Sequence, residues 1–451
     1  MAGNHYENAV QVMRTDNGRA SAAIPSRSLN RLSARELIRL LELGEISSID
    51  ILRDCLARIE EREKTVQAWA HLEPDAAYAE AARIAGRPDR GVLRGIPLGV
   101  KDVIDTADMP TAYGSPIYEG HRPAADAAVV AAVRAAGGIV LGKTVTAEFA
   151  HRYPGPTTHP LDPSRTPGGS SSGSAACVAD FMVPLALGTQ TTASTVRPAS
   201  YCGVVGYRPS YGLVSCWGIK PSAGSFDTVG VFARDIPDCT LLRDILLGIE
   251  PRPVQLSDNA PRIGFCRTIL WPMVEPAAAA RIEAAVSRLA AGGAPVIDVD
   301  LPSVFEPVAS AHRVISSYEL ARNLVAERLF HADQLSPLLK EGKMAEGLRY
   351  GMPDYFAAVK QLEAARMAVD GVFASFDILI TPGTTGIAPV GTASTGTSDF
   401  GAIWTALHLP SMSVPLPDRL EGMPLGVQLV TPRGEDIKLG DMALWIANKW
   451  R

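Results

Sequence analysis

The chain has 451 residues, of which 47% are hydrophobic and 20% charged, and its formal net charge is −5. This composition is typical of a globular protein, and the acidic balance argues against a nucleic-acid-binding protein. The length alone would suggest roughly three domains. Because enzymes built on one large sheet often exceed the usual domain size, we expect a single core with additions.

The cysteines predict neither a disulfide framework nor a metal centre. Six are scattered without a CxxC pair, and no histidine cluster accompanies them (Cys55, Cys177, Cys202, Cys216, Cys239, Cys266). The first 28 residues are polar and lack the apolar region of a signal peptide. No apolar run approaches the ~18 residues that a membrane-spanning helix needs. We therefore expect a cytoplasmic protein without metal, cofactor or membrane partner.

Two helices are predicted at the start of the chain. Residues 34–45 place leucine and isoleucine at helical spacing after Ser33, a candidate N-cap with Glu36 as its capping-box partner. A second helix follows from Ser47 or Ser48 over the segment 49–63. We expect this helical pair to lie on a larger body.

The body shows alternating helices and strands. The segment 126–150 predicts a helix capped by Asp126 and closed by Gly137, followed by a buried strand over 139–142. A β-α-β rhythm recurs over 262–301, and the segments 376–383 and 423–430 predict two more strands. Such alternation indicates an α/β fold with a mixed or parallel sheet. Between 305 and 372 the pattern is wholly helical, which suits either a cover over a site or a structural cap.

The stretch TPGGSSSGSAACVAD, residues 166–180, raises the question of function. Segments rich in serine and glycine are usually flexible linkers. Here an apolar segment follows at once, so the loop is held at both ends. A loop of this kind offers hydroxyls and accessible backbone amides, which suit a phosphate or a developing oxyanion.

Two known catalytic loops fit this stretch poorly. A phosphate-binding P-loop needs Gly-Lys-Ser/Thr, and no lysine lies in 166–198. The segment 169–173 formally matches G-x-S-x-G, but a proline-rich segment precedes it rather than the strand that a nucleophile elbow requires. The downstream histidines, which lack a matching acid pattern, are interpreted as structural or exposed (His312, His331, His408).

Several ordered blocks resemble the amidase signature family. They are GIPLGVKDVIDT, GGIVLGKTVTAEFA, RTPGGSSSGSAACVA, VPLALGTQTTASTVRPASYCGVVGYRPSYGLVS, SFDTVGVFARDIPD and MPLGVQLV, and they span 94–240 and the last 75 residues or so. The resemblance implies the α/β amidase-signature fold, with a central twisted mixed sheet flanked by helices. It implies one domain over 1–450, made of N-terminal helices (29–75), a signature core (94–240), a helical insertion over the site (300–375) and C-terminal core strands with a helix (376–450).

The resemblance also implies a Ser–cis-Ser–Lys triad. By position in the family pattern, Lys101 is the base, Ser170 the bridging cis-serine and Ser194 the nucleophile. The oxyanion hole then consists of the backbone amides of Thr191, Thr192, Ala193 and Ser194. These residue types suit the chemistry, because a serine hydroxyl needs an adjacent base. A lysine can serve only if burial lowers its pKa from about 10.4 toward 7.

The second loop departs from the commoner family pattern G-T/S-D-T-G-G-S. Gln190 replaces the aspartate, Thr192 and Ala193 replace two glycines, and Arg197 lies three places after Ser194. A threonine or alanine would be strained if the backbone there required a positive φ. We interpret the sequence as a specificity variant of the family, with urethanase-like or aryl acylamidase-like members among the candidates. Lys143 and Glu148 are interpreted as a structural polar pair, and Arg197 and Asp227 as braces for the loops.

The resemblance predicts a serine amidase that cleaves carbon–nitrogen bonds through an acyl-enzyme at Ser194. The expected substrates are small or aryl amides, with carbamates (urethanes) and aryl esters as alternatives. Four aromatic residues are the candidates for an apolar substrate pocket (Tyr207, Trp217, Phe226, Trp404). A monomer or homodimer is expected. The rival hypotheses are an A-type component of a tRNA-dependent amidotransferase, which works with partner proteins, and a catalytically silent binding protein.

Overall fold

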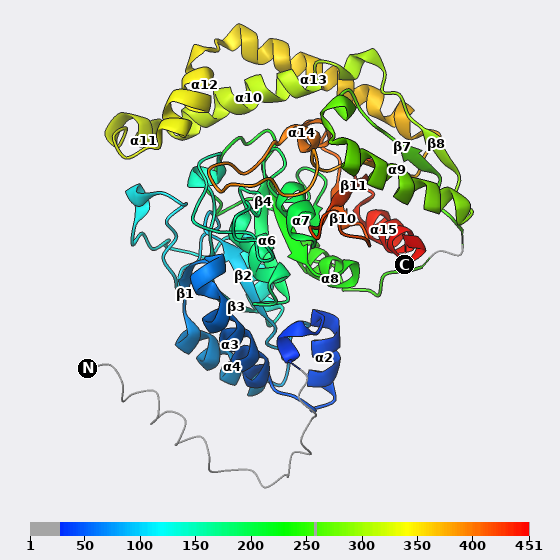
Figure 1. The fold of residues 1–451 in the computed structure, drawn as a ribbon. Helices are drawn as coiled ribbons and strands as arrows, with labels where there is room; N and C mark the ends of the chain where they lie inside the picture. The colour runs from blue at the N-terminus through cyan, green and yellow to red at the C-terminus, as the bar shows by residue number, and fades with distance from the viewer. Residues whose placement is uncertain (1–27, 257–258, 451) are drawn as a thin grey trace, which may run out of the picture.

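A computed structural model describes residues 28–256 and 259–450 of the chain (Figure 1). The segment 1–27, which carries most of the polar stretch in which we expected no signal peptide, lies outside the described residues. No helix in the described residues is long and apolar enough to span a membrane.

One mixed sheet organises the described part of the chain. Its eleven strands lie in the order β1-β3-β2-β4-β6-β5-β10-β11-β9-β7-β8. They are β1 (Trp69–Leu72), β2 (Pro97–Lys101), β3 (Ile139–Thr144), β4 (Leu185–Gln190), β5 (Val205–Arg208), β6 (Thr228–Ala233), β7 (Ile263–Phe265), β8 (Val296–Asp298), β9 (Ile378–Pro382), β10 (Ser411–Pro415) and β11 (Gly426–Val430). The predicted strands at 139, 263, 378 and 426 are all present, and the mixed α/β sheet is confirmed.

Apart from β1, which pairs antiparallel with β3 at one edge, the strand directions divide the sheet into three parts. β3, β2 and β4 run parallel to one another, and so do β9, β7 and β8 at the other end. The middle strands from β4 through β6, β5, β10 and β11 to β9 are antiparallel. The two parallel parts correspond to the β-α-β patterns in the sequence.

Helices cover both faces of the sheet. Alternation along β4 sends Leu185 and Leu187 into one core and Ala186 into the other, as the strand period requires. The first core packs against α5 (Ala128–Ala135), α8 (Ile236–Leu247), α9 (Pro276–Ala291) and α15 (Asp436–Trp450). The second packs against α3 (Ser48–Val66), α4 (Pro74–Ala85), α6 (Ser172–Ala179) and α7 (Val196–Cys202).

Helix caps decide where the N-terminal helices begin. Ser33 accepts a hydrogen bond from the Glu36 amide at the start of α2 (Ala34–Glu42), and Ser47 forms a reciprocal capping box with Asp50 before α3. Both helices are therefore where the sequence predicts them. Asp126, in contrast, is not the N-cap of α5: its carboxylate accepts a hydrogen bond from the Ala107 amide, so a nearby loop has captured it.

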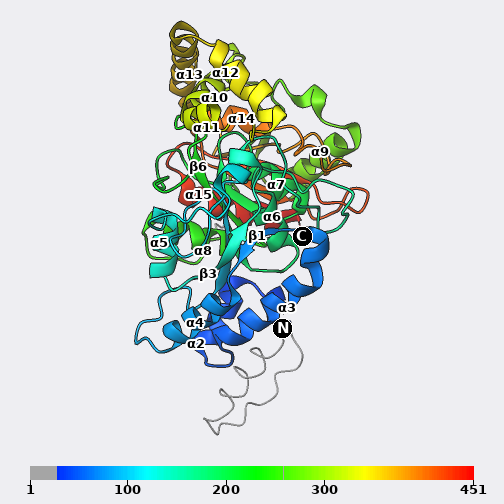
Figure 2. The ribbon, with the colours of Figure 1, turned by 90° about the vertical axis from the view of Figure 1, so that its left-hand side faces the viewer.

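The helical insertion forms a cap at the end of the molecule opposite α2–α4 (Figures 1 and 2). The cap comprises α10 (Val308–Asn323), α11 (Val325–Phe330), a helical segment at Leu338–Met344, α12 (Ala345–Arg349) and α13 (Met352–Phe373), and α14 (Asp399–Ala406) lies beneath it. Glu327 on α11 accepts a hydrogen bond from Tyr118 and pairs with Lys220 of the body. The Ser336 hydroxyl bonds to Glu148, and both contacts are among the polar links that join the cap to the body.

Candidate active site

Lys101 ends the buried strand β2 and points into the interior. Its side chain is fully buried, and its Nζ lies 2.9 Å from Ser170 Oγ and 2.7 Å from Thr189 Oγ1. The next residue, Asp102, points the other way, as expected for an extended chain, and its Oδ1 lies 3.5 Å from Lys143 Nζ. The apolar strand thus carries one lysine to the serine loop and shields it from water.

Burial is the main electrostatic influence on Lys101. It holds the pKa of the lysine well below the usual 10.5, because charging an amine in a dry interior is unfavourable. The Arg197 guanidinium lowers this pKa further, and the Asp227 carboxylate raises it. The environment therefore favours the neutral amine, which is the form able to accept a proton.

The serine-rich loop is a rigid part of the interior rather than a linker. Residues 166–177 are all buried, and the Gly169–Ser170 peptide bond is cis, as the resemblance implies. Arg197 donates hydrogen bonds from its Nε and one terminal nitrogen to the Gly169 carbonyl and from the other to the Gly396 carbonyl. Gly168 has a φ of +83°, and an added Cβ would meet Pro198 at 2.9 Å. The loop needs this glycine for both reasons.

Gln190 holds the loop that carries Ser194 between β4 and α7. Its Oε1 accepts hydrogen bonds from the amides of Thr195 and Val196, at 2.9 and 3.1 Å, at the start of α7. Its Nε2 donates to Thr405 Oγ1, whose hydroxyl in turn donates to the Thr192 carbonyl. The neutral glutamine therefore braces both ends of the loop.

Three carbonyl groups of this loop are held by the protein. His312 Nε2 donates to the Thr191 carbonyl at 2.8 Å, Thr405 Oγ1 to that of Thr192 at 2.8 Å, and the Arg197 amide to that of Ala193 at 2.9 Å. In a planar trans peptide the following N–H points away from the C=O. These bonds therefore direct the amides of residues 192–194 away from the groups that hold the carbonyls.

The two replaced glycines cause no backbone strain. Neither Thr192 nor Ala193 is among the residues with a positive φ, so side chains are accommodated at both places. Room for the Ala193 methyl group comes from Gly401 in α14, where an added Cβ would lie only 2.6 Å from Ala193 Cβ. The alanine in the loop and the glycine in the helix form a complementary pair.

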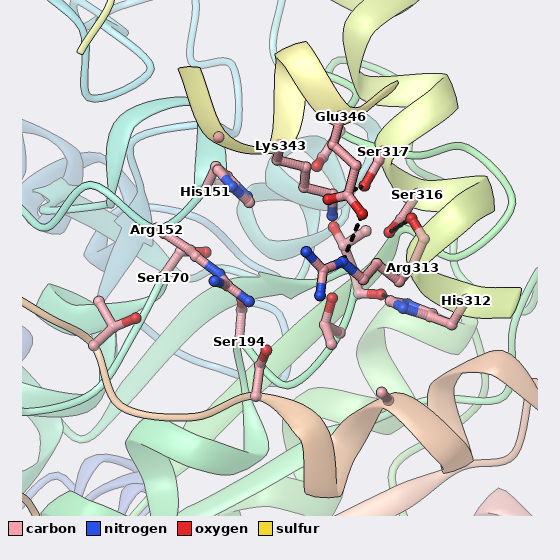
Figure 3. Close-up of a pocket in the computed structure, with 18 of the residues that line it drawn as sticks. His151, Arg152, Ser170, Ser194, His312, Arg313, Ser316, Ser317, Lys343 and Glu346 are labelled. Carbon is pink, nitrogen blue, oxygen red and sulfur yellow. Dashed lines mark hydrogen bonds and ion pairs between the residues drawn. The ribbon is translucent and has the colours of Figure 1, made fainter. Parts of the chain in front are cut away.

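A cavity of about 300 Å³ lies between this loop and the cap. Ser170 and Ser194, which are 2% and 8% exposed, face it from the body (Figure 3). The cap contributes residues from α10, the segment Leu338–Met344 and α12 (Ala309, His312, Arg313, Ser316, Ser317, Leu338, Glu341, Gly342, Lys343, Glu346, Arg349). The insertion therefore covers the site rather than serving as a distant structural cap.

The four aromatic residues predicted to bind substrate do not line this cavity. Tyr207 is buried in β5 and donates a hydrogen bond to Asp436, whereas Trp217 is 63% exposed on the surface. Phe226 and Trp404 are buried in the core beneath the cap. The lining of the cavity is therefore polar and charged, and the predicted aromatic lining is wrong.

Other polar residues singled out in the sequence have structural partners. Lys143 pairs with Asp102 and donates to the Ile104 carbonyl, and Glu148 bonds to Ser336, so the expected Lys143–Glu148 pair is wrong. Asp227 accepts hydrogen bonds from Thr191 Oγ1 and the amides of Ser222 and Ala223, which confirms its bracing role.

Burial raises the pKa of Asp227 to about 6 and lowers that of His312 to about 3. Within the described residues, no group of three or more His, Cys, Asp or Glu side chains could hold a metal ion.

The cap residues of the cavity were missed in the sequence, although α10 carries a signal. Ala309, Arg313, Ser316 and Ser317 follow helical spacing, and so they share one face of the helix. A small and polar face on a partly buried helix indicates a hydrated cavity. No comparable pattern marks Arg152 or Lys343.

Comparisons with known proteins agree with this geometry. The Amidase family model matches residues 50–439. The A component of the glutamyl-tRNA(Gln) amidotransferase of Symbiobacterium thermophilum is 33% identical over 476 residues, covering 93% of this chain and 96% of the relative. A crystal structure of an amidase superposes with a TM-score of 0.85 at 30% identity, covering 93% of this chain and all of the other. The native peptide amidase from Stenotrophomonas maltophilia superposes with a TM-score of 0.78 at 29% identity, covering 93% and 97%.

These matches extend over nearly the whole described sheet and both serine loops. With its sheet, its cis peptide before Ser170 and its buried lysine, the chain belongs to the amidase signature family of hydrolases.

Proposed function

We propose that this protein hydrolyses the carbon–nitrogen bond of small carboxamides through an acyl-enzyme at Ser194. The observation that carries the proposal is the fully buried Lys101 amine, 2.9 Å from Ser170 Oγ, in a loop that shares one cavity with Ser194. A neutral amine at this position can accept a proton from Ser170. Ser170 can donate and accept at once, and so it can relay the proton of Ser194.

The reaction then has two balanced halves. Ser194 Oγ bonds to the substrate carbonyl carbon while its proton passes through Ser170 to Lys101. The carbon–nitrogen bond breaks, and the proton returns through Ser170 to the leaving amine. Water next attacks the acyl ester, and its proton follows the same route before Ser194 is released with the carboxylic acid. The net change is amide plus water to acid plus amine.

The loop at residues 191–194 supplies the proposed oxyanion hole. The carbonyls of residues 191–193 are bound by the protein, which leaves the amides of residues 192–194 oriented toward the other side of the loop. Backbone donors of this kind act on the charge that develops in the tetrahedral intermediate. Because every residue except proline carries a backbone N–H, Thr192 and Ala193 can replace glycines without removing a donor.

The decisive experiment is a substrate panel with the purified chain. Carboxamides, anilides, carbamates and aryl esters are supplied separately, and the released amine, alcohol or phenol is measured. Intact-mass spectrometry detects an acyl adduct, which peptide mapping should place on Ser194. Ser194→Ala and Lys101→Met should abolish amide turnover, whereas Ser172→Ala, in the same loop but bonded to the Val145 carbonyl, should retain it. Full activity of a folded Lys101→Met protein would refute the proposal.

The curated relative supports a second candidate, an A-type amidotransferase component that works with partner proteins. Gln190, Thr192 and Ala193 stand against it, because the resemblance leads us to expect aspartate and paired glycines in the members that use glutamine. The same panel separates the two. Glutamine hydrolysis that requires added partner proteins would favour the second candidate, and turnover of other amides by the chain alone favours the first.

A further inference from the structure

Three cationic side chains converge on the cavity above Ser194. Figure 3 shows Arg152, Arg313 and Lys343 pointing inward from three segments that are far apart in the sequence. Arg152 follows the 3-10 turn Glu148–Ala150, Arg313 lies on α10, and Lys343 lies in the helical segment Leu338–Met344. None of them belongs to the serine loops, so they are available for a task other than proton transfer.

One of the three already has a partner. Arg313 Nε donates to Glu346 at 2.7 Å, and Glu346 also accepts from Tyr350 and from Ser317. Arg152 and Lys343 differ, because neither side chain forms an ion pair or hydrogen bond with any of the residues that the structure describes. Neither cation therefore has an anion within hydrogen-bonding distance, although carboxylates line other parts of the cavity.

The surroundings make this arrangement unfavourable in the absence of a ligand. Lys343 is half-buried, and burial together with the nearby Arg152 lowers its pKa to about 8, although Asp227 and Glu346 oppose the change. Arg152 itself is exposed to water, but its charge still disfavours the charged form of the half-buried Lys343 unless an anion joins them. An unpaired cation in a substrate cavity is better explained by a ligand than by stability.

The charge of the cavity limits the kind of ligand. Five arginine and lysine residues line it, against three carboxylates, an excess of two positive charges (Arg152, Arg197, Arg313, Lys343, Arg349; Glu341, Glu346, Asp399). Arg197 is committed to the Gly169 and Gly396 carbonyls, and Arg313 to Glu346. Without these committed groups, three cations remain against two carboxylates, an excess of one positive charge that suits a monoanion. The guanidinium of Arg152 matches the geometry of a carboxylate.

We propose that Arg152 and Lys343 bind a carboxylate of the substrate, so that the preferred amides carry a carboxylate on their acyl or amine part. The turnover of such amides rests on the proposed function, but the binding of the carboxylate does not.

Matched substrate pairs test this subsite. Succinyl-4-nitroanilide is compared with butyryl-4-nitroanilide for the acyl side, and 4-acetamidobenzoate with acetanilide for the amine side. In the pair whose carboxylate lies on the recognised side, kcat/KM should be higher for the carboxylated member by roughly tenfold to a hundredfold, the range expected for hydrogen bonds to a charged group. Lys343→Met and Arg152→Gln should each reduce that ratio, mainly through KM. Lys340→Met, on the same helical segment but outside the cavity, should leave it unchanged.

A binding measurement separates the subsite from the chemistry. The Ser194→Ala protein is titrated calorimetrically with succinamate and butyramide, and with 4-acetamidobenzoate and acetanilide. Tighter binding of one carboxylated member, lost in Ser194→Ala/Lys343→Met, supports the subsite even if the wild-type protein hydrolyses nothing, in which case only the proposed function fails. Equal binding within both pairs overturns the subsite, and hydrolysis of the neutral amides would then still support the proposed function.

Discussion

The complementarity between Ala193 and Gly401 provides a sharp test of the proposed oxyanion loop. In the Gly401→Ala variant, the new Cβ would lie 2.6 Å from Ala193 Cβ, 2.7 Å from the Thr192 carbonyl oxygen and 2.9 Å from Ala193 Cα. Non-bonded carbon atoms rest about 3.5–4.0 Å apart. The loop and α14 must therefore separate by about 1 Å, given the contact distances above.

The expected effects on stability and catalysis differ in size. Overpacking costs about 1–3 kcal/mol of unfolding free energy, and replacing glycine with alanine in a helix returns about 1 kcal/mol. The net loss should therefore be no more than about 2 kcal/mol. A misplacement of about 1 Å near the reacting atoms can cost roughly a hundredfold in rate. We therefore expect kcat to fall by roughly a hundredfold in a protein that remains folded.

The assay measures kcat on an amide cleaved by the wild-type protein, alongside unfolding in urea. Gly371→Ala is the matched control, because an added Cβ on this glycine of α13 meets no atom within 4 Å. It should keep wild-type kcat and gain a little stability. Adding Ala193→Gly to Gly401→Ala removes one of the three close contacts and should restore part of kcat. A folded Gly401→Ala protein with wild-type kcat would refute the role assigned to the loop.

Three further predictions concern the buried polar groups. Asp227→Asn should shift the acidic limb of the kcat/KM profile to lower pH, because removing this carboxylate lowers the pKa of Lys101 and keeps the base neutral in more acidic solution; a shift to higher pH contradicts this. Thr189→Val removes a hydrogen-bond partner of Lys101 and should lower kcat roughly fivefold, as the loss of about 1 kcal/mol implies, with unfolding curves as the control for folding. Lys143→Met leaves Asp102 buried without its cation and should lower the free energy of unfolding in urea by about 3 kcal/mol; an unchanged value would mean that the pair contributes nothing.

Much of the fold could be predicted from local sequence. The strands at 139, 263, 378 and 426 are short apolar runs with helices or turns between them, and Ser33 and Ser47 mark helix starts by their own hydroxyls. The strand order and the antiparallel middle of the sheet could not be predicted in this way. They depend on pairings such as β5 with β10, which join residues about two hundred positions apart.

The incorrect predictions have the same physical origin as the unpredicted strand order. Asp126 has the right side chain for an N-cap but bonds to Ala107 in a neighbouring loop. Tyr207 was expected in the substrate pocket, yet its hydroxyl meets Asp436 from the C-terminal helix. In each case a residue's partner comes from another segment of the chain, which no local pattern specifies.

The residues of the candidate site also fall into two groups, those with a local sequence signal and those without one. Lys101, Ser170 and Ser194 could be proposed from the sequence because each stands in a block that resembles a family pattern. The cationic wall of the cavity could not be found in this way, since Arg152 and Lys343 meet there only after the insertion has folded over the body. Its charge was therefore unforeseen.

The placement of the cap has a consequence for how new specificities arise in this protein. Every group proposed to move a proton or hold the oxyanion lies in the body, while much of the opposite wall of the cavity belongs to the cap helices. The cap is joined to the body by the buried hydrophobic cluster that includes Phe226 and Trp404, and by polar contacts such as Glu327 with Lys220 and Ser336 with Glu148. Apart from His312, which holds the Thr191 carbonyl, substitutions on the inner face of the cap can therefore change which substrate is accepted without disturbing how it is cleaved, so selection can act on recognition and on chemistry separately.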